Sequence, residues 1–486
     1  MFIDQKQQRR IWPWALLVLL VLVGVGVWMV YTGLRTLTVE KIVASDTIKK
    51  YAGEENNEVV ALMPRLLGFT EPQTYLFLFQ NNTEMRPSGG FIGAYAAVHL
   101  DKGKMDMLAV EGSEELDRRT PPEWKPVPPL PLTEHLGVSK WYFRDANWSP
   151  DFSESAKKVR ELYAAETGVA AADIDGVIAV TPTVVEALLR ITGPITIQDI
   201  TFTAENVTEK LEYEVEYGYR DRDIPFETRK QILKPFMTEL LHKVRLHAFF
   251  DLNDFIAEMK KMADEKQIVL SVDTKDVQKK IDEFGWSGKV KEFDGDYLQW
   301  VDANLAALKT DHAMKRSLAY ELRPDGKGKY VAVATMTYVN TGSFDWRTSR
   351  YRTYARVYVP QGSQLVSVEG SMLKDKSSEA GRVDQGVELN KTWFGTFISI
   401  EPGQTKTLRF TYVLPDALTT KIAQKDYQLF IQKQAGTIAH GLTLRLNFGT
   451  SIRGANPPEA EKYWGDAEYR VDTDLRMDRR FGVEIE

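Results

Sequence analysis

The longest run of apolar positions lies near the N-terminus. Residues 11–31 read IWPWALLVLLVLVGVGVWMVY and carry no charge. About 20 apolar residues in a helix match the roughly 30 Å hydrocarbon core of a bilayer. Tryptophan and tyrosine stand near both ends of the run, and these side chains favour the membrane interface. The pattern therefore predicts a transmembrane helix over residues 11–31.

The charges before this run predict its orientation. Lys6, Arg9 and Arg10 precede it, and only Asp4 opposes them. Positive charge is retained on the cytoplasmic side, so we expect residues 1–10 to form a cytoplasmic tail. The protein is then expected to be a signal-anchored, single-pass protein of the plasma membrane, with the bulk of its chain extracytoplasmic.

Two alternatives exist for the same run. A cleaved signal peptide has a shorter apolar region, of about 7–15 residues, and ends in small residues. This run ends instead in WMVY at residues 28–31. The other alternative is a buried helix of a water-soluble domain, where so long a run without a charge is difficult to place.

An α/β pattern follows a polar stretch, residues 32–62, that we interpret as a helical stalk. Over residues 63–312, nearly continuous apolar runs alternate with amphipathic segments. This alternation predicts a layered α/β core domain whose strands are covered on both faces. The predicted strands are residues 75–80, 91–100, 105–110 and 176–180. The predicted helices include one that starts at Ser149-Pro150 and others near residues 204–217, 227–248, 252–264 and 274–284.

From about residue 315 the period of the apolar positions changes to two. Residues 407–414 and 442–448 alternate apolar and polar side chains, and proline–glycine turns separate the segments. Such alternation predicts a β-sandwich domain over residues 313–452. Residues 453–486 are polar and are predicted to form a weakly structured tail.

Composition narrows the chemistry. A chain of 486 residues suggests about three domains. The net charge of −6 does not indicate a nucleic-acid partner. There is no cysteine, which excludes disulfides, iron–sulfur clusters, thiolate metal sites and cysteine nucleophiles.

Two polar segments are candidate ligand sites. In residues 81–90 (NNTEMRPSGG), between two predicted strands, Arg86 offers a planar fork for phosphate or carboxylate, and the glycines allow close approach of the backbone. Residues 143–150 (FRDANWSP) lead into a predicted helix, whose unpaired N–H groups favour anions. The candidate anion ligands are Arg86, Arg144, Gly89, Gly90 and Ser149. The candidate magnesium ligands are Glu84, Asp145 and Asp151, because Mg²⁺ prefers oxygen. The alternative is that these charges pair locally and that the turns are structural.

Several segments resemble the bacterial domain-of-unknown-function family 4012. The motifs are NNTEMRPSGGFIGAY, FRDANWSPDFSESA, DGVIAVTP, TGPITI, VDANLAALKTD and VYVPQGS, spread over about residues 70–415. Members of this family resemble the chain in having an N-terminal membrane anchor. The family name states that the activity is unassigned, so the resemblance implies architecture more than function.

The order of features is also similar, more weakly, to the LytR–CpsA–Psr phosphotransferases of the envelope. On that analogy Arg86 binds phosphate and Mg²⁺ is a cofactor. The chain departs from their pattern at residues 110–114, where it has VEGSE instead of an S-I-P-R-D-type segment.

Two hypotheses about function follow. In the first, the protein is a non-catalytic envelope protein that binds a cell-surface glycan, a lipid-linked glycan or a protein partner, and no cofactor is assigned to it. In the alternative, it is a magnesium-dependent phosphotransferase that attaches glycopolymer to the cell wall. The common hydrolase, nucleotide-binding and zinc-protease signatures are missing from the sequence, which motivates the first.

Overall fold

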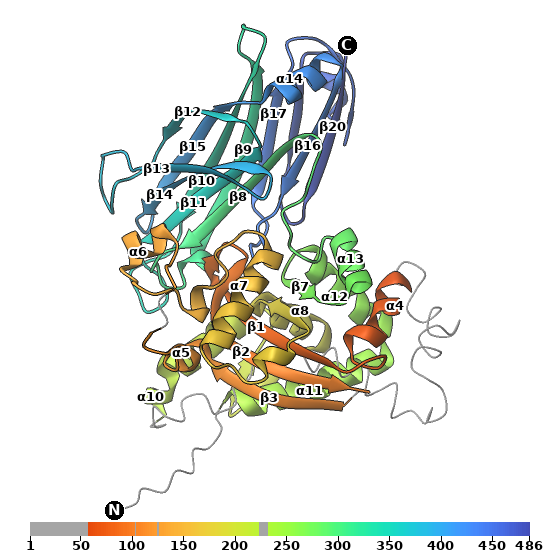
Figure 1. Ribbon diagram of the computed structural model, residues 1–486, viewed down its shortest axis with the longest axis vertical. Coiled ribbons are helices and arrows are strands. Elements are labelled where there is room, and N and C mark those ends of the chain that lie inside the picture. The colour runs from red at the N-terminus through yellow and green to blue at the C-terminus, as the bar shows by residue number, and fades with distance from the viewer. Residues whose placement is uncertain (1–56, 103, 124–125, 223–231) are drawn as a thin grey trace, which may run out of the picture.

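The computed structural model describes residues 57–102, 104–123, 126–222 and 232–486. The predicted cytoplasmic tail, transmembrane helix and most of the predicted stalk lie outside these residues. Within the described part, no helix is both long and apolar enough to cross a membrane. Figure 1 shows a mixed α/β molecule in which a helix-rich part, lower in the view, is joined end to end with a strand-rich part.

A five-stranded sheet forms the centre of the helix-rich part, in the order β3-β2-β1-β4-β7. β1, β2 and β3 form an antiparallel meander, β4 runs parallel to β1, and β7 is antiparallel to β4. The strands are β1 (Gln73–Arg86), β2 (Gly89–Asp101), β3 (Lys104–Gly112), β4 (Gly176–Val180) and β7 (Ile268–Val272). The apolar run at residues 75–80 lies within β1, and the run at residues 176–180 coincides with β4.

Alternate residues of β1 pack into two different hydrophobic cores. Tyr75 and Phe77 belong to one core, which α8, α11, α12 and α13 also line, and Leu76 and Leu78 belong to the other, which α7 lines. Because both faces of the sheet are covered, both sets of side chains must be apolar, and the sequence shows a continuous run. The helices of this part are α4 (Asn57–Leu66), α5 (Ser113–Asp117), α6 (Leu130–Leu136), α7 (Phe152–Ala165), α8 (Pro182–Thr192), α9 (Val207–Tyr213), α10 (Tyr219–Asp221), α11 (Leu233–Phe250), α12 (Leu252–Asp264) and α13 (Lys275–Phe284).

Shorter elements join these helices and strands. They are η2 (Phe143–Asp145), η3 (Ala171–Asp173), the hairpin β5 (Ile195–Ile197) and β6 (Ile200–Phe202), and the π-helical turn η4 (Glu214–Gly218). Another short turn, η6 (Thr310–Ala313), lies between β8 (Asp296–Asn304) and β9 (Met314–Pro324) of the strand-rich part.

Two further sheets form the strand-rich part. The six-stranded sheet has the order β12-β15-β10-β9-β17-β19, and the seven-stranded sheet has the order β13-β14-β11-β8-β16-β20-β18. Side chains of both sheets belong to one hydrophobic core, in which the rings of Trp300 and Phe410 lie 5.5 Å apart. The elements are β8 (Asp296–Asn304), β9 (Met314–Pro324), β10 (Tyr330–Asn340), β11 (Tyr351–Pro360), β12 (Gln364–Glu369), β13 (Val383–Glu388), β14 (Lys391–Ile400), β15 (Thr405–Val413), α14 (Asp416–Ala423), β16 (Asp426–Gln432), β17 (Gly441–Asn447), β18 (Ile452–Asn456), η7 (Glu461–Tyr463), β19 (Glu468–Asp474) and β20 (Arg479–Ile485).

The C-terminal stretch is not the weakly structured tail that the sequence predicted. Strands β19 and β20 pair with β17 and β16, and the side chains of Phe481, Val483 and Ile485 are buried in the shared core. These three apolar residues alternate with Arg480, Gly482 and Glu484, so the average polarity of the stretch concealed their period of two. The strand-rich part also starts earlier than residue 313, because β8 pairs with β11 and β16 in the seven-stranded sheet.

Candidate functional site

The predicted glycine loop is the tight end of a β-hairpin. β1 and β2 continue through it, with Arg86 paired to Gly89 and Met85 paired to Gly90. A Cβ atom on Gly89 would overlap the side chain of Gln80, and one on Gly90 would overlap the backbone of Asn81. The glycines are therefore explained by the close approach of the protein's own chain.

Arg86 lies inside the protein, where two carboxylates and the carbonyls of Met85 and Asn304 bind its guanidinium. Its Nε is 3.2 Å from Asp145 Oδ1, its NH1 donates to the carbonyl of Asn304 at 2.7 Å, and its NH2 lies 3.4 Å from Glu84 Oε1. Burial alone would lower the pKa of Arg86, but the two carboxylates raise it overall, so the side chain stays charged. The ion pair with Asp145 and the hydrogen bond to Asn304 together connect β1, η2 and β8.

Arg144 reaches the same carboxylate from the other side. Its Nε lies 3.9 Å from Asp145 Oδ2, and its NH1 lies 3.3 Å from Asp117 Oδ2. The two candidate arginines thus lie close together. They meet across Asp145, which occupies the position where a phosphate was expected.

Asp151 lies apart from the other predicted metal ligands. Its carboxylate caps α7 by accepting from the backbone N–H of Glu154 at 3.1 Å, and it also accepts from the N–H of Val290 at 2.9 Å. Ser149 Oγ accepts from the N–H of Asp151 at 3.2 Å, so the start of the helix is filled by its own residues. Among the described residues, no group of three or more histidine, aspartate or glutamate side chains is arranged to hold a metal ion.

The strand-rich part covers the carboxyl ends of β1 and β4, which is where open α/β sheets commonly bind ligands. The loop between β16 and β17 lies there. Asn82 Nδ2 donates to the carbonyl of Gly436 at 3.0 Å, and Gln267 Nε2 donates to the carbonyl of Thr437 at 2.8 Å. Gln434 Nε2 donates to the carbonyl of Arg86 at 3.1 Å. The expected anion site is therefore filled by protein.

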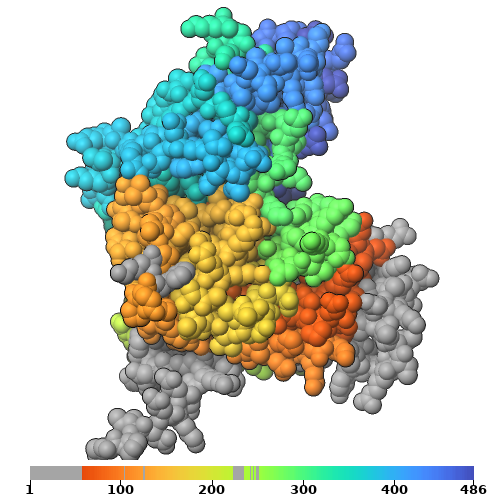
Figure 2. Space-filling model, viewed as in Figure 1, coloured from red at the N-terminus to blue at the C-terminus, as the bar shows by residue number. Residues whose placement is uncertain are grey.

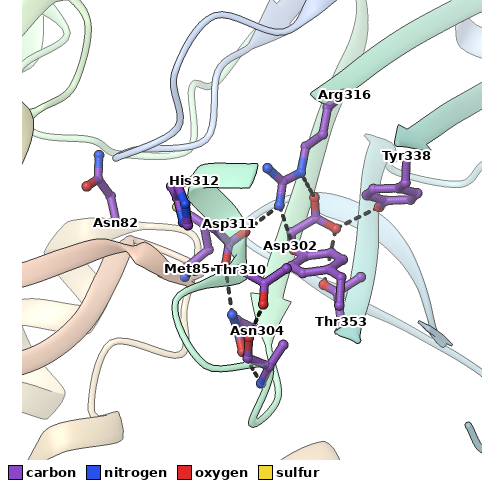
Figure 3. Close-up of polar contacts among 12 residues, drawn as sticks. Asn82, Met85, Asp302, Asn304, Thr310, Asp311, His312, Arg316, Tyr338 and Thr353 are labelled. Atoms are coloured by element: carbon purple, nitrogen blue, oxygen red, sulfur yellow. Dashed lines mark hydrogen bonds and ion pairs between the residues drawn. The ribbon is translucent and has the colours of Figure 1, made fainter. Parts of the chain in front are cut away.

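A network of buried charges fixes this junction (Figure 3). Arg316 lies between Asp302, at 3.1 Å, and Asp311, with which it forms a close ion pair. Asp311 Oδ2 accepts from the N–H of Met85 at 2.9 Å, and Asp302 Oδ1 accepts from Tyr338 at 2.7 Å. Burial raises the pKa of Asp302, and the Arg316 charge opposes this shift. The network holds β1 of one part against β8 and β9 of the other.

An open groove of about 710 Å³ lies at the same junction, between the α6–α7 region and strands β11, β13 and β14. In Figure 2 the orange and gold residues of the helix-rich part meet the cyan residues of the strand-rich part. The aromatic lining residues are Trp141, Trp148, Tyr354 and Trp393. The charged lining residues are Glu154, Lys158, Arg356, Asp384 and Glu388. Ser149, one of the predicted site residues, also lines this groove, whereas Arg86 and Arg144 do not.

Stacked side chains hold the aromatic wall in place. The Arg356 guanidinium lies over the Trp148 ring, 5.0 Å from the centroid, and its NH2 donates to the Trp148 carbonyl at 2.7 Å. The rings of Trp148 and Tyr354 are 6.3 Å apart at an angle of 34°. Lys158 lies 4.8 Å from the centroid of Trp141. The wall therefore combines residues of both parts in one rigid surface.

Carboxylates face the groove from the strand side. Asp384 accepts from Tyr354 at 2.6 Å and from Arg382 at 2.7 Å, and Glu388 accepts from Tyr358 at 2.5 Å. Burial and the bond to Asp384 raise the pKa of Tyr354, so its hydroxyl remains a donor. The three carboxylates and two cations that line the groove give it a net charge of −1. Such a groove offers aromatic faces and oxygen acceptors, and it does not attract anions.

Few features of the sequence indicate the groove. Its residues lie far apart in the chain, from Pro129 to Trp393, and meet only because the two parts dock. The one local indication is the pair Trp141 and Trp148, which flank η2 in the segment before α7.

Comparison with known proteins gives a family for one segment. Residues 70–216 match the family described as "Protein of unknown function (DUF4012)". No curated protein gives a significant match. Among solved structures, a Legionella pneumophila protein provisionally described as nutrient binding is 9% identical over 39% of this chain and 71% of its own, with a TM-score of 0.26. An M1 zinc metallopeptidase from Deinococcus radiodurans is 10% identical over 37% of this chain and 43% of its own, with a TM-score of 0.17. Similarities at this level carry no argument about fold or function.

Proposed function

We propose that this chain, whose residues 70–216 belong to the DUF4012 family, is an anchored envelope protein that binds a neutral saccharide of the cell surface in the groove between its two parts. The observation that carries the proposal is the lining of that groove, where the rings of Trp148 and Trp393 and the carboxylates of Asp384 and Glu388 share one open surface.

The residue types match the chemistry of a sugar ring. A pyranose has faces of C–H bonds that pack on aromatic rings, and hydroxyls that donate to carboxylates. Binding grooves typically combine an apolar lining with a few oriented polar groups. Here Trp148 is held by Arg356, and Asp384 is held by Tyr354 and Arg382. Little side-chain entropy is therefore lost when a ligand binds.

The charge of the groove favours a neutral ligand over a phosphate-bearing polymer. Its two cations are already engaged: Arg356 binds the Trp148 carbonyl and Glu388, and Lys158 pairs with Glu161 at 2.5 Å. A phosphate would therefore meet an excess of carboxylates, which repel it. The neutral hydroxyls of a sugar, in contrast, can donate hydrogen bonds to these carboxylates.

The anchor places this groove outside the cell in our proposal. Residues 11–31 would span the plasma membrane with residues 1–10 inside, on the hydropathy and charge of the sequence. The strand-rich part would act as a sandwich-like module that supplies one wall of the groove. A tethered protein of this kind meets surface-bound ligands rather than cytosolic metabolites.

The phosphotransferase alternative requires phosphate at Arg86. That guanidinium already binds Asp145, Glu84 and the Asn304 carbonyl, and only 3% of the residue is exposed. A phosphate would have to displace a carboxylate inside the protein, which costs several kcal/mol of desolvation. We therefore propose binding rather than transfer, without a bound cofactor.

Calorimetric titration of the detergent-solubilised full chain with a neutral N-acetylglucosamine oligomer tests the proposal. Trp393→Ala removes one aromatic face, and a well-packed tryptophan typically contributes 2 kcal/mol or more to binding, so we expect affinity to fall about tenfold or more. Trp464→Ala is the matched control, because Trp464 is 64% exposed on η7's C-terminal side and does not line the groove. Equal affinities of the two variants would remove the groove from the binding site.

A further inference from the structure

A second aromatic surface lies away from the groove. Tyr213 and Tyr217, four residues apart across α9 and η4, stack at 6.3 Å, and Trp346 packs edge-on against both, at 5.5 Å and 5.3 Å. Tyr213 is 36% exposed, Tyr217 is 37% exposed, and Phe344 in the same loop as Trp346 is 67% exposed. We call Tyr213, Tyr217, Phe344 and Trp346 the aromatic patch.

The loop that carries Phe344 and Trp346 is held in a fixed shape. Asp345 accepts from the backbone N–H groups of Arg347 and Thr348 at 2.7 Å and 2.6 Å. The Arg347 Nε donates to Glu212 of α9 at 2.8 Å. Exposed aromatic side chains on such a loop keep apolar surface in contact with water and do not strengthen the core. Large exposed apolar groups commonly mark contact surfaces.

The composition of the patch fits one kind of partner. Tyrosine and tryptophan have apolar rings with polar tips, and they favour the interface between lipid headgroups and acyl chains. Arg220 lies over the Tyr217 ring at 5.8 Å, where its guanidinium can reach headgroup phosphate. A π-helical turn such as η4 often marks a functional position.

Three glutamates near the patch each have a cationic partner. Glu216 pairs with Lys309 at 3.9 Å, Glu214 with Arg222, and Glu212 with Arg347. A surface with paired charges does not depend on anionic lipid for attraction. Insertion of aromatic rings is then the main contribution to a contact with the bilayer.

The length of the chain before the described residues brings the patch within reach of the bilayer. Residues 32–56 separate the end of the proposed transmembrane helix from Asn57, where α4 begins. Twenty-five residues span about 38 Å as a helix and about 85 Å when extended. Figure 1 places α4 and α10, which directly follows η4, both in the lower half of the molecule, away from the distal strands and the C-terminus.

We infer that the aromatic patch rests on the outer leaflet of the membrane in which the chain is anchored, and so orients the saccharide groove relative to the cell surface. This inference rests on the anchor of the proposed function. The tether supplies a high local concentration of lipid, so even a weak contact of the patch is populated.

The absence of cysteine from the chain permits a direct test. A single cysteine at Glu216, beside Tyr217, carries an environment-sensitive nitrobenzoxadiazole label in the full chain, reconstituted into phosphatidylcholine vesicles. The matched control is a cysteine at Val366 of β12, which is 59% exposed in the strand-rich part. Doxyl-labelled phosphatidylcholine serves as the quencher. We expect at least twofold stronger quenching at position 216 than at position 366, and loss of the difference when Phe344→Ser and Tyr217→Ser are added.

Equal quenching at the two positions would overturn the inference. A blue-shifted label at position 216 that lipid does not quench would also overturn it, because a protein would then cover the patch. Alkaline carbonate extraction of the same vesicles reports separately on the anchor. A chain that is released fails the proposed function, whereas a chain that stays bound with an unquenched label at position 216 fails only this inference.

Discussion

The guanidinium of Arg356 lies over the ring of Trp148, 5.0 Å from its centroid, and donates to the carbonyl of the same residue at 2.7 Å. The first residue belongs to β11 and the second to the segment before α7, so one stacked pair joins the two parts of the molecule and forms the groove wall. The saccharide site that we propose exists only when this contact is made.

Replacement of Arg356 by lysine should weaken binding more than folding. Lysine keeps the charge but loses the planar stack and the fixed N–H directions. We expect affinity for the neutral oligosaccharide to fall about tenfold, with a change in the free energy of unfolding of about 1 kcal/mol. Calorimetry and chemical denaturation measure the two quantities. Arg445→Lys is the control, since Arg445 pairs with exposed Asp472 far from the groove.

Arg86→Ala should destabilise the protein strongly. The change removes the closer cation of buried Asp145, which keeps only Arg144 at 3.9 Å, and it removes the partner of half-buried Glu84; breaking a buried ion pair by removal of one partner typically costs about 3–5 kcal/mol. Denaturant unfolding measures this cost, and Arg118→Ala, at a side chain that is 73% exposed, should change it by less than about 0.5 kcal/mol. If Arg86→Ala leaves stability intact but abolishes a phosphotransfer activity, Arg86 is a catalytic residue and our assignment is wrong.

A pair of buried acids predicts loss of stability at alkaline pH. Burial and the neighbouring Asp117 raise the pKa of Glu166 from 4.5 to about 8, and burial raises that of Asp117 from 3.8 to about 6. Folding therefore favours the protonated forms. Their stabilising contribution is complete below about pH 4 and declines as the pH rises through 6 to 8.

Glu166→Gln should flatten this decline, because the amide stays neutral at every pH. We expect the variant to be more stable than the parent at pH 8.5 and nearly equal to it at pH 4.5, as measured by thermal unfolding across that range. Glu114→Gln, at an exposed carboxylate on α5, should follow the parent. Parallel curves for parent and Glu166→Gln would mean that protonation of Glu166 does not contribute to the decline.

Truncation after Asn456 should abolish the strand-rich fold. The deletion removes β19 and β20, together with the buried side chains of Tyr469, Phe481 and Val483. Loss of three core side chains costs about 2–5 kcal/mol each, a sum comparable to the whole stability of a typical domain. Circular dichroism and limited proteolysis of the chain that ends at Asn456 measure the outcome. Cooperative unfolding of the strand-rich part in the truncated chain would instead support the weakly structured tail that the sequence predicts.

The layered core of the helix-rich part could be predicted from the sequence, because its strands are covered on both faces. The run GVIAV coincides with β4, and the amphipathic segment at residues 252–264 coincides with α12. The period of two in the second half of the chain likewise predicted strands where β15 and β17 lie. Local periodicity is sufficient for such elements.

The candidate site could not be predicted in the same way. Arg86 was expected at an open loop, but docking of the strand-rich part buries it and places the carbonyls of Gly436 and Thr437 over the neighbouring strand ends. The groove depends on the same docking, since Trp148 and Trp393 are separated by more than half of the chain. The chemistry of individual side chains predicted an anion site at the arginines. In the structure, carboxylates pair with these arginines, and aromatic side chains line the open groove instead.

The central claim is that the groove selects neutral saccharides. Its most direct test is a competition titration, in which the solubilised full chain is loaded with the neutral N-acetylglucosamine oligomer and challenged with the same oligomer carrying a terminal phosphate. Our account predicts that the phosphorylated competitor displaces the bound ligand at least about tenfold less effectively than free neutral oligomer does when it is used as the competitor. It also predicts that Glu388→Gln, which removes one negative charge from the groove, reduces this difference in displacement. Stronger displacement by the phosphorylated oligomer would contradict the account.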